Sequence, residues 1–233
     1  MESIHFRRSH VLSLPVVSSA NPSKGFTLTE LIVVLAIIGI IMSIVMTSQS
    51  SFNKTLILQN ATYDIALTLR DAETYGLSSR ASGVITNAGY GVHFQKGTPS
   101  IFTFFADTYP SSPSAFNCHG VPVGGVSAPD AQPGDCIYTA GQDQKVIEYT
   151  LGNGITVSDF CAFNGNWSCA YAQGGSLSSL DIVFARPNPD AFIRANGSSY
   201  TSACMKVASP QGGTRFISVA ASGQITAKAT SCP

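Results

Sequence analysis

The chain has 233 residues with 13 basic and 13 acidic side chains, so its formal net charge is zero. This length can bury the core of one domain with an appended element, and the charge balance excludes a general electrostatic attraction to nucleic acid or to an acidic membrane surface. Only 11% of the residues are charged, which suits a loop-rich extracytoplasmic β domain better than a cytosolic enzyme.

The first element in chain order is an apolar segment at residues 26–46, FTLTELIVVLAIIGIIMSIVM, whose one charged residue is Glu30. A helix of this length measures about 32 Å, close to the thickness of a bilayer core of about 30 Å. A cleaved secretory signal is one alternative, but its apolar run is shorter and ends in a small-residue cleavage site. A plain signal anchor is another alternative, but it leaves Glu30 unexplained, since an ionisable group within a membrane segment is costly.

The stretch KGFTLTELIVVLAIIGII resembles the class III signal and first helix of type IV prepilins and type II secretion pseudopilins. In that family a membrane peptidase cuts after the glycine and methylates the new amino terminus. The resemblance implies cleavage between Gly25 and Phe26, N-methylation of Phe26, and a role for Glu30 in assembly. A carboxylate in an apolar environment is tolerated when it meets a cation, and in the family this cation is the amino terminus of a neighbouring subunit.

The same resemblance implies the partners and the location of the protein. The partners would be other pilin or pseudopilin subunits, the prepilin peptidase and methyltransferase, an inner-membrane assembly platform and membrane lipid. The chain would cross the inner membrane once, with its head on the extracytoplasmic side, and the assembled filament would lie in the periplasm or at the cell surface. Residues 1–25 would be a leader peptide and residues 26–46 a transmembrane and filament-core helix.

Residues 47–80 are expected to continue this helix as an amphipathic segment. No proline occurs between Pro22 and Pro99. Small and apolar residues at spacings of 3, 4, 4, 3 and 4 predict a stripe that faces a core: Leu58, Ala61, Ile65, Leu69, Ala72 and Gly76. We therefore expect one helix from about Phe26 to about Ser79. A membrane helix followed by a separate surface helix is the alternative.

Residues 81–233 are expected to form a β-rich extracytoplasmic head, because short alternating runs are separated there by Gly, Pro, Asn and Ser. The expected strands are 91–94, 101–105, 145–151, 180–184, 203–207, 215–220 and 224–227. Asn153-Gly154 and Ser222-Gly223 predict hairpin turns, and residues 110–142 predict a long surface insertion. The expected class is α+β, with the long helix packed on an antiparallel sheet and with disulfide-stapled loops.

Six cysteines follow the apolar segment and none precedes it. An even number on one side of a membrane segment indicates disulfides in an oxidising compartment. Zinc is the alternative, but the close Cys or His pairs typical of zinc sites do not occur. Several pairings remain open, of which we expect the sequential one, each bond contributing on the order of 3 kcal/mol: Cys118–Cys136, Cys161–Cys169 and Cys204–Cys232.

Two further resemblances narrow the expectation. The stretch ATYDIALTLRDAETYGLSSRA resembles the helix end of H-type pseudopilins and related minor pilins, and GYGVHF, LDIVFARP and FISVAASGQIT resemble strands of that head. The acidic C-terminal loop that binds calcium in the major pseudopilin is not evident. We therefore assign no metal ligands and expect no cofactor.

Catalysis is not expected. His93 lies in an expected strand, and His119 has no recognisable nucleophile or carboxylate partner. Binding at a filament tip is the alternative, because some related minor pilins contact DNA, an adhesion target or secreted cargo. From Phe26 onward the chain has 10 basic and 12 acidic residues, so nucleic acid is not the expected partner.

Three aromatic residues around one cysteine pair have two interpretations. Phe160, Phe163 and Trp167 form either an exposed contact loop or the small core of a stapled loop. The sequence thus predicts a minor pilin or pseudopilin subunit that a prepilin peptidase processes and that assembles into a type IV pilus or a type II secretion pseudopilus. A tip module of a type IV or competence pilus, binding DNA or a surface, is the alternative.

Overall fold

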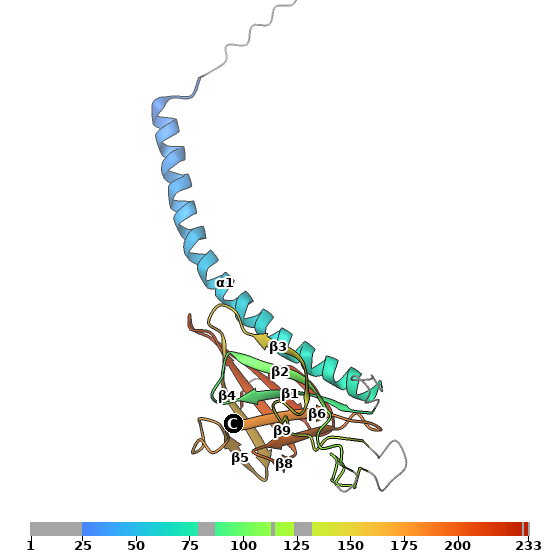
Figure 1. Cartoon of the computed structure of the whole chain (residues 1–233). Coiled ribbons are helices and arrows are strands. Elements are labelled where there is room, and N and C mark those ends of the chain that lie inside the picture. The colour runs from blue at the N-terminus through green and yellow to red at the C-terminus, as the bar shows by residue number, and fades with distance from the viewer. Residues whose placement is uncertain (1–24, 79–86, 113–114, 124–131, 230, 233) are drawn as a thin grey trace, which may run out of the picture. The chain divides into compact units, whose positions relative to one another are not determined.

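The computed structural model describes residues 25–78, 87–112, 115–123, 132–229 and 231–232 (Figure 1). The chain divides into two compact units, residues 1–47 and residues 48–233. The described part of the first unit is the start of one long helix, and the second unit contains the rest of that helix and all the strands.

The helix α1 spans Leu28–Leu77, 50 residues without interruption. It begins two residues later than expected because Thr27 caps it: the Thr27 hydroxyl accepts a hydrogen bond from the Glu30 N–H at 3.3 Å, and the Thr27 carbonyl accepts the Leu31 N–H at 3.2 Å. Such a cap supplies an acceptor to amides that have no partner within the helix. The element α1 includes residues from both segments that the sequence analysis distinguished, 26–46 and 47–80.

Two antiparallel sheets form the head. The six-stranded sheet has the order β3 (Gln144–Thr150), β2 (Ile101–Asp107), β1 (Gly89–Gln95), β6 (Ser179–Phe184), β7 (Ala191–Ala195) and β8 (Ser198–Tyr200). The five-stranded sheet has the order β11 (Ile225–Ala229), β10 (Thr214–Ala220), β9 (Ser202–Ala208), β4 (Thr156–Asn164) and β5 (Asn166–Cys169). The α+β class is therefore confirmed.

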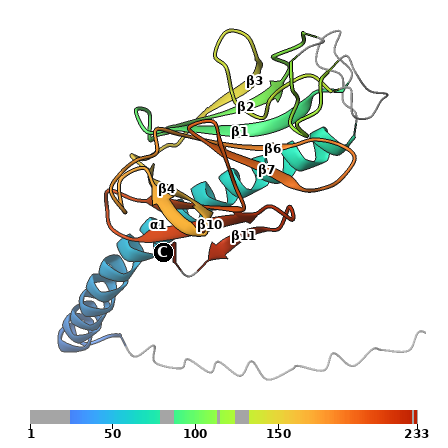
Figure 2. The same ribbon diagram turned by 90° about the horizontal axis from the view of Figure 1, so that it is seen from below.

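The part of α1 that belongs to the head packs between the two sheets (Figure 2). All six residues of the predicted stripe are buried, and five of them share one apolar core with both sheets. Gly76 marks the closest approach, since a Cβ there would lie 2.1 Å from the Phe184 carbonyl oxygen of β6. A glycine is thus required where helix and strand backbones touch.

The seven expected strands are all present, with ends that differ by up to two residues. Four strands were not predicted: β4, β5, β7 and β8. The turn at Ser222-Gly223 does join the antiparallel pair β10 and β11. The hairpin expected at Asn153-Gly154 is wrong, because that turn leads from β3 in one sheet to β4 in the other.

Three disulfides join Cys118 to Cys136, Cys161 to Cys169 and Cys204 to Cys232, in the sequential order expected from the sequence. The first lies within the expected insertion at residues 110–142 and packs against Phe105 and Val183. The described part of that insertion is therefore fixed to the outer side of the six-stranded sheet.

Candidate processing and assembly site

Gly25 and Phe26, the expected cleavage position, lie before the first turn of α1. Both residues are exposed, and Phe26 has 81% of its surface accessible. A Cβ placed on Gly25 would meet no atom within 4 Å. Packing against the described residues therefore does not explain the glycine.

Glu30 lies on the exposed surface of the first turn of α1. Thr27 and Glu30 have the spacing of a capping box, in which Ser or Thr at the cap is followed three residues later by Glu or Gln. A carboxylate in this turn also interacts favourably with the helix dipole. The spacing was visible in the sequence, but this local role was not predicted from it.

Residues Leu28–Met46 form the one described helix segment that is long and apolar enough to cross a membrane, judged by length and composition. None of this segment is buried within the chain. A Cβ added to Gly39, at the centre of the segment, would meet no atom within 4 Å. Such a surface needs cover from lipid or from other helices, since apolar area in water is unfavourable.

The second half of α1 also has an exposed apolar stripe, on the side away from the core. Leu56, Tyr63 and Leu67 are exposed, and their spacing of seven and four residues places them on one helical face. Leu67 has 59% of its surface accessible. The helix thus has one buried apolar stripe that packs in its own head, and Leu56 and Leu67 remain partly exposed to solvent beside the described residues.

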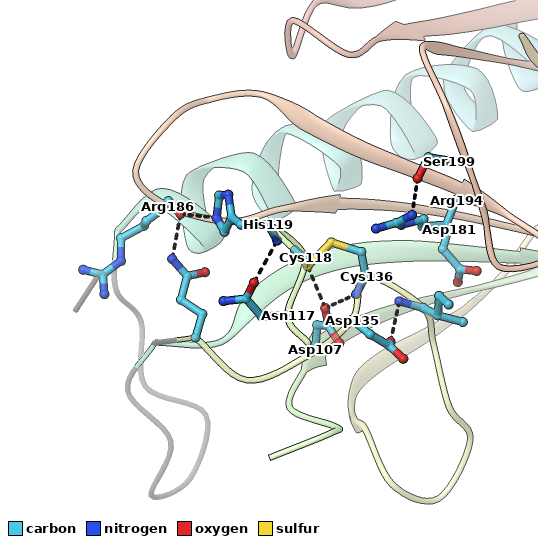
Figure 3. Close-up of a disulfide and its surroundings, with 12 residues drawn as sticks. Asp107, Asn117, Cys118, His119, Asp135, Cys136, Asp181, Arg186, Arg194 and Ser199 are labelled. Atoms are coloured by element: carbon cyan, nitrogen blue, oxygen red, sulfur yellow. Dashed lines mark hydrogen bonds between the residues drawn. A yellow bond between two sulfur atoms is a disulfide. The ribbon is translucent and has the colours of Figure 1, made fainter. Parts of the chain in front are cut away.

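A buried carboxylate, Asp107, anchors the stapled insertion in the head (Figure 3). Its Oδ2 accepts the Cys136 N–H at 2.7 Å, while Oδ1 has no hydrogen-bond partner among the described residues. Gly134 lies directly against this carboxylate, since a Cβ there would be 2.3 Å from its carbon. Burial, and then the charge of Asp143, raises the pKa of Asp107 well above its ordinary value.

Asp143 and Asp181 hold the same insertion in different ways. Asp143 accepts backbone N–H groups of Thr108 at 2.9 Å and of Thr139 at 2.6 Å, yet burial still raises its pKa. Asp181 accepts the Tyr138 N–H of the insertion at 3.2 Å and lies 2.6 Å from the Nδ1 atom of His93 in β1. Burial raises the pKa of Asp181 despite these contacts. These carboxylates organise loops, and His93 is part of that structure.

The contact of His119 is also structural: its Nε2 lies 2.8 Å from the Arg186 carbonyl oxygen. Two clusters in the described residues have the proximity of metal ligands, Asp107 with Cys118 and Cys136, and Asp159 with Cys161 and Cys169. In both clusters the cysteines form disulfides, and a metal is bound by the thiolate. Neither cluster fits a metal centre.

The three aromatic residues around Cys161–Cys169 are partly core and partly surface, so each of the two expected arrangements, an exposed contact loop and a small core, holds for some of them. Phe160 is fully buried in the main core, whereas Phe163 and Trp167 are half-buried on the β4–β5 hairpin. The ring centroids of Phe163 and Trp167 lie 5.1 Å apart. This distance is expected for residues that are directly opposite each other in an antiparallel pair.

Comparison with protein families finds the prokaryotic N-terminal methylation motif at residues 20–46. No match to the chain was found among curated proteins or among solved structures. The motif supports a type IV pilin-like or pseudopilin subunit, a structural component rather than an enzyme. It implies processing by a prepilin peptidase and assembly with other pilin subunits, and together with the apolar helix it fits a single-pass protein anchored in the inner membrane.

Proposed function

We propose that this chain is a minor subunit of a pilin-like filament, stored in the inner membrane and assembled through α1. The observation that carries the proposal is the methylation motif at residues 20–46, which overlaps an apolar helix segment that the described residues leave uncovered. Lipid covers this surface before assembly, and the helices of other subunits cover it afterwards.

The domain limits follow from this role. Residues 1–25 are a leader that is removed, residues 26–46 form the membrane and filament-core helix, residues 47–80 link it to the head, and residues 81–233 complete an extracytoplasmic head. The disulfides support an oxidising location for the head.

The processing chemistry is assigned to three residues. Peptide cleavage falls between Gly25 and Phe26, and the new amino group of Phe26 is methylated, which leaves it cationic. The Glu30 carboxylate then pairs with the amino terminus of a neighbouring subunit. The exposure of Gly25, Phe26 and Glu30 supports this assignment because each is accessible to a partner.

Among filament subunits, we assign the chain to the minor H-type pseudopilins of type II secretion. The sequence at residues 61–81 and the strands of the head support this assignment by resemblance. A type IV pilus subunit is the closest alternative, since it shares the same motif and the same helix.

The decisive experiment tests whether the leader is removed and whether the protein serves a secretion pseudopilus or a pilus. The protein is purified from cells with their prepilin peptidase, and its amino-terminal peptide is analysed by mass spectrometry. We expect it to begin at Phe26 with one methyl group. In a deletion strain, loss of exoprotein secretion with intact pili supports the pseudopilus, and the reverse result supports the pilus. A chain that retains residues 1–25 contradicts the whole proposal.

A further inference from the structure

The outer face of the five-stranded sheet has a groove of about 360 Å³ that the assembly role does not use. Trp167 of β5, Ser202 of β9, Ser218 of β10 and Gln224 before β11 contribute to its lining. This volume falls in the range of small-ligand sites in proteins.

The strand register places the lining side chains on one face. Trp167 lies opposite Phe163, which lies opposite Ser202, and Ser202 lies opposite Ala220. The neighbouring row on the same face, two residues along each strand, contains Cys169, Cys161, Cys204, Ser218 and Thr226. The alternate residues between these rows, such as Ala203 and Val219, point into the core.

Two disulfides fix this face. Cys161–Cys169 joins the two strands of the β4–β5 hairpin, and Cys204–Cys232 ties the chain's C-terminal segment to β9. Ser231, next to the second bond, contributes to the groove lining. Covalent ties of this kind lower the entropy lost when a ligand is bound, because the site is already in place.

The lining is neutral and rich in hydrogen-bonding groups. It contains four hydroxyl side chains, one amide and one indole, and none of the lining side chains is ionisable outside a disulfide. Within the part of the chain that the structure describes, the hydrogen bonds found do not use the side chains of Trp167, Ser202 or Gln224. These donors and acceptors are thus available to a ligand.

We propose that this groove binds a neutral saccharide. The half-exposed indole of Trp167 offers a flat apolar surface for the C–H face of a sugar ring, and hydroxyl and amide groups around it complement the sugar hydroxyls. An anionic ligand such as DNA needs cations along its path, and the groove lining provides none. This inference goes beyond filament assembly and does not depend on it.

Trp167 is the one tryptophan of the chain, so its fluorescence reports the groove directly. The full-length protein is placed in lipid nanodiscs free of glycolipid and of sugar-based detergent. It is titrated with cellotetraose, maltotetraose, chitotetraose and lacto-N-tetraose, and with a single-stranded oligothymidine. We expect a saturable change in tryptophan emission with at least one of the four saccharides.

Variants then locate the interaction. Gln224→Ala keeps the fluorescent reporter, and we expect it to weaken saccharide binding by about tenfold. By calorimetry, Trp167→Ala abolishes binding, whereas Trp167→Phe retains part of it because an aromatic surface remains. Phe116→Ala removes an aromatic side chain that is 62% exposed and outside the groove, and it leaves binding unchanged.

The proposal is overturned if none of the four saccharides changes the emission in a saturable way. It is also overturned if oligothymidine alone does so, or if Gln224→Ala and Phe116→Ala bind equally well. Near-ultraviolet circular dichroism confirms that each variant is folded. We expect Gln224→Ala to leave removal of the leader and incorporation into filaments unaffected. A failure of the saccharide proposal is therefore distinct from a failure of the assembly role.

Discussion

Glu30 occupies the third position of a capping-box sequence in its own helix and has a proposed role between subunits. A substitution that removes only its charge separates the two. Gln is accepted at the third position of a capping box, so Glu30→Gln keeps the start of α1 but removes the charge. We expect normal cleavage and a reduction of about tenfold or more in filament incorporation, because the amino terminus of the neighbour loses its counter-charge.

The measurement is the ratio of the protein in sheared filaments to that in membranes, with the amino-terminal mass as the control for processing. Glu30→Asp, which retains the charge on a shorter side chain, should recover part of the incorporation. Wild-type incorporation of Glu30→Gln would show that the charge has no role in assembly.

Gly25 offers a second test at the residue scale. A Cβ at this position would meet no described atom within 4 Å apart from its chain neighbours, so Gly25→Val should leave the head as stable as before. We expect it to block cleavage, because a branched side chain then occupies the scissile bond. Mass spectrometry should find the leader attached, with an unchanged unfolding temperature of the head. Efficient cleavage of the variant would contradict the assignment of the site.

Asp107 makes the stability of the head depend on pH. Its pKa is raised by burial and by Asp143, so the folded state binds a proton more tightly than the unfolded state. The resulting stabilisation is complete below the unfolded pKa of Asp and is lost as the pH rises through the raised folded pKa. We expect the unfolding temperature to fall as the pH rises above the ordinary pKa of Asp, about 3.9.

Asp107→Asn should flatten this decline, because the amide is neutral at every pH and its oxygen can still accept the Cys136 N–H. The measurement is a thermal unfolding series in lipid nanodiscs across the pH range. Asp190→Asn, at an exposed loop position, is the matched control and should leave the slope unchanged. Equal slopes for wild type and Asp107→Asn would exclude Asp107 as the source.

At the scale of elements, Gly76 fixes the distance between α1 and β6. Alanine is the better helix former by about 1 kcal/mol, yet a Cβ here would lie 2.1 Å from a backbone oxygen that cannot swing away. We expect Gly76→Ala to destabilise the head by about 1–3 kcal/mol. Urea unfolding followed by circular dichroism measures this change.

Gly39→Ala in the same helix is the control, since a Cβ there would meet no atom within 4 Å outside its own stretch of helix. It should not alter the unfolding of the head. If the free energy of unfolding of Gly76→Ala equals or exceeds that of the wild type, α1 can move away from β6 without destabilising the head.

The elements also show what the sequence could and could not predict. The helix stripe and the seven strands with clear alternation followed from periodicity. The β7–β8 hairpin had a signal that we missed, Asn196-Gly197, whose positive φ values of 48° and 79° suit a tight turn. Asn153-Gly154 has similar φ values but connects different sheets, because a dipeptide specifies a turn and not the partners of the flanking strands.

The β4 strand escaped prediction for a different reason. Its register shifts between Val157 and Asp159, and such a bulge interrupts the alternation on which the prediction rests. Asp159 is buried within this strand, where its carboxylate accepts the Tyr171 and Ala172 N–H groups. The N–H groups that stabilise this carboxylate in the strand come from a loop about 12 residues further along the chain. The local sequence around Asp159 does not reveal this contact.

The processing residues and the groove differ in how far the sequence alone predicts them. The motif around Gly25, Phe26 and Glu30 is local, so the sequence alone indicated it. The groove beside Trp167 depends on strands from five parts of the chain coming into register, and no local pattern predicts that. The carboxylates around Asp107 were hidden for the same reason.

At the scale of the whole molecule, residues 48–233 form a compact unit with their own core. We expect a chain that begins at residue 48 to fold in an oxidising compartment and to stay monomeric in water without detergent. Sedimentation and near-ultraviolet circular dichroism measure this. The full-length chain, purified identically, should sediment with membranes. Aggregation of the shortened chain would show that its fold depends on the preceding residues.

The uncovered surface of Leu28–Met46 has a consequence for filament turnover. A subunit released from a broken filament has no stable state in open water, because roughly twenty apolar residues would become wetted at once. If the chain assembles as proposed, we expect depolymerisation to return each copy directly to lipid at the filament base. Fragments sheared from the cell should then persist as polymers and not dissolve into a pool of reusable monomers.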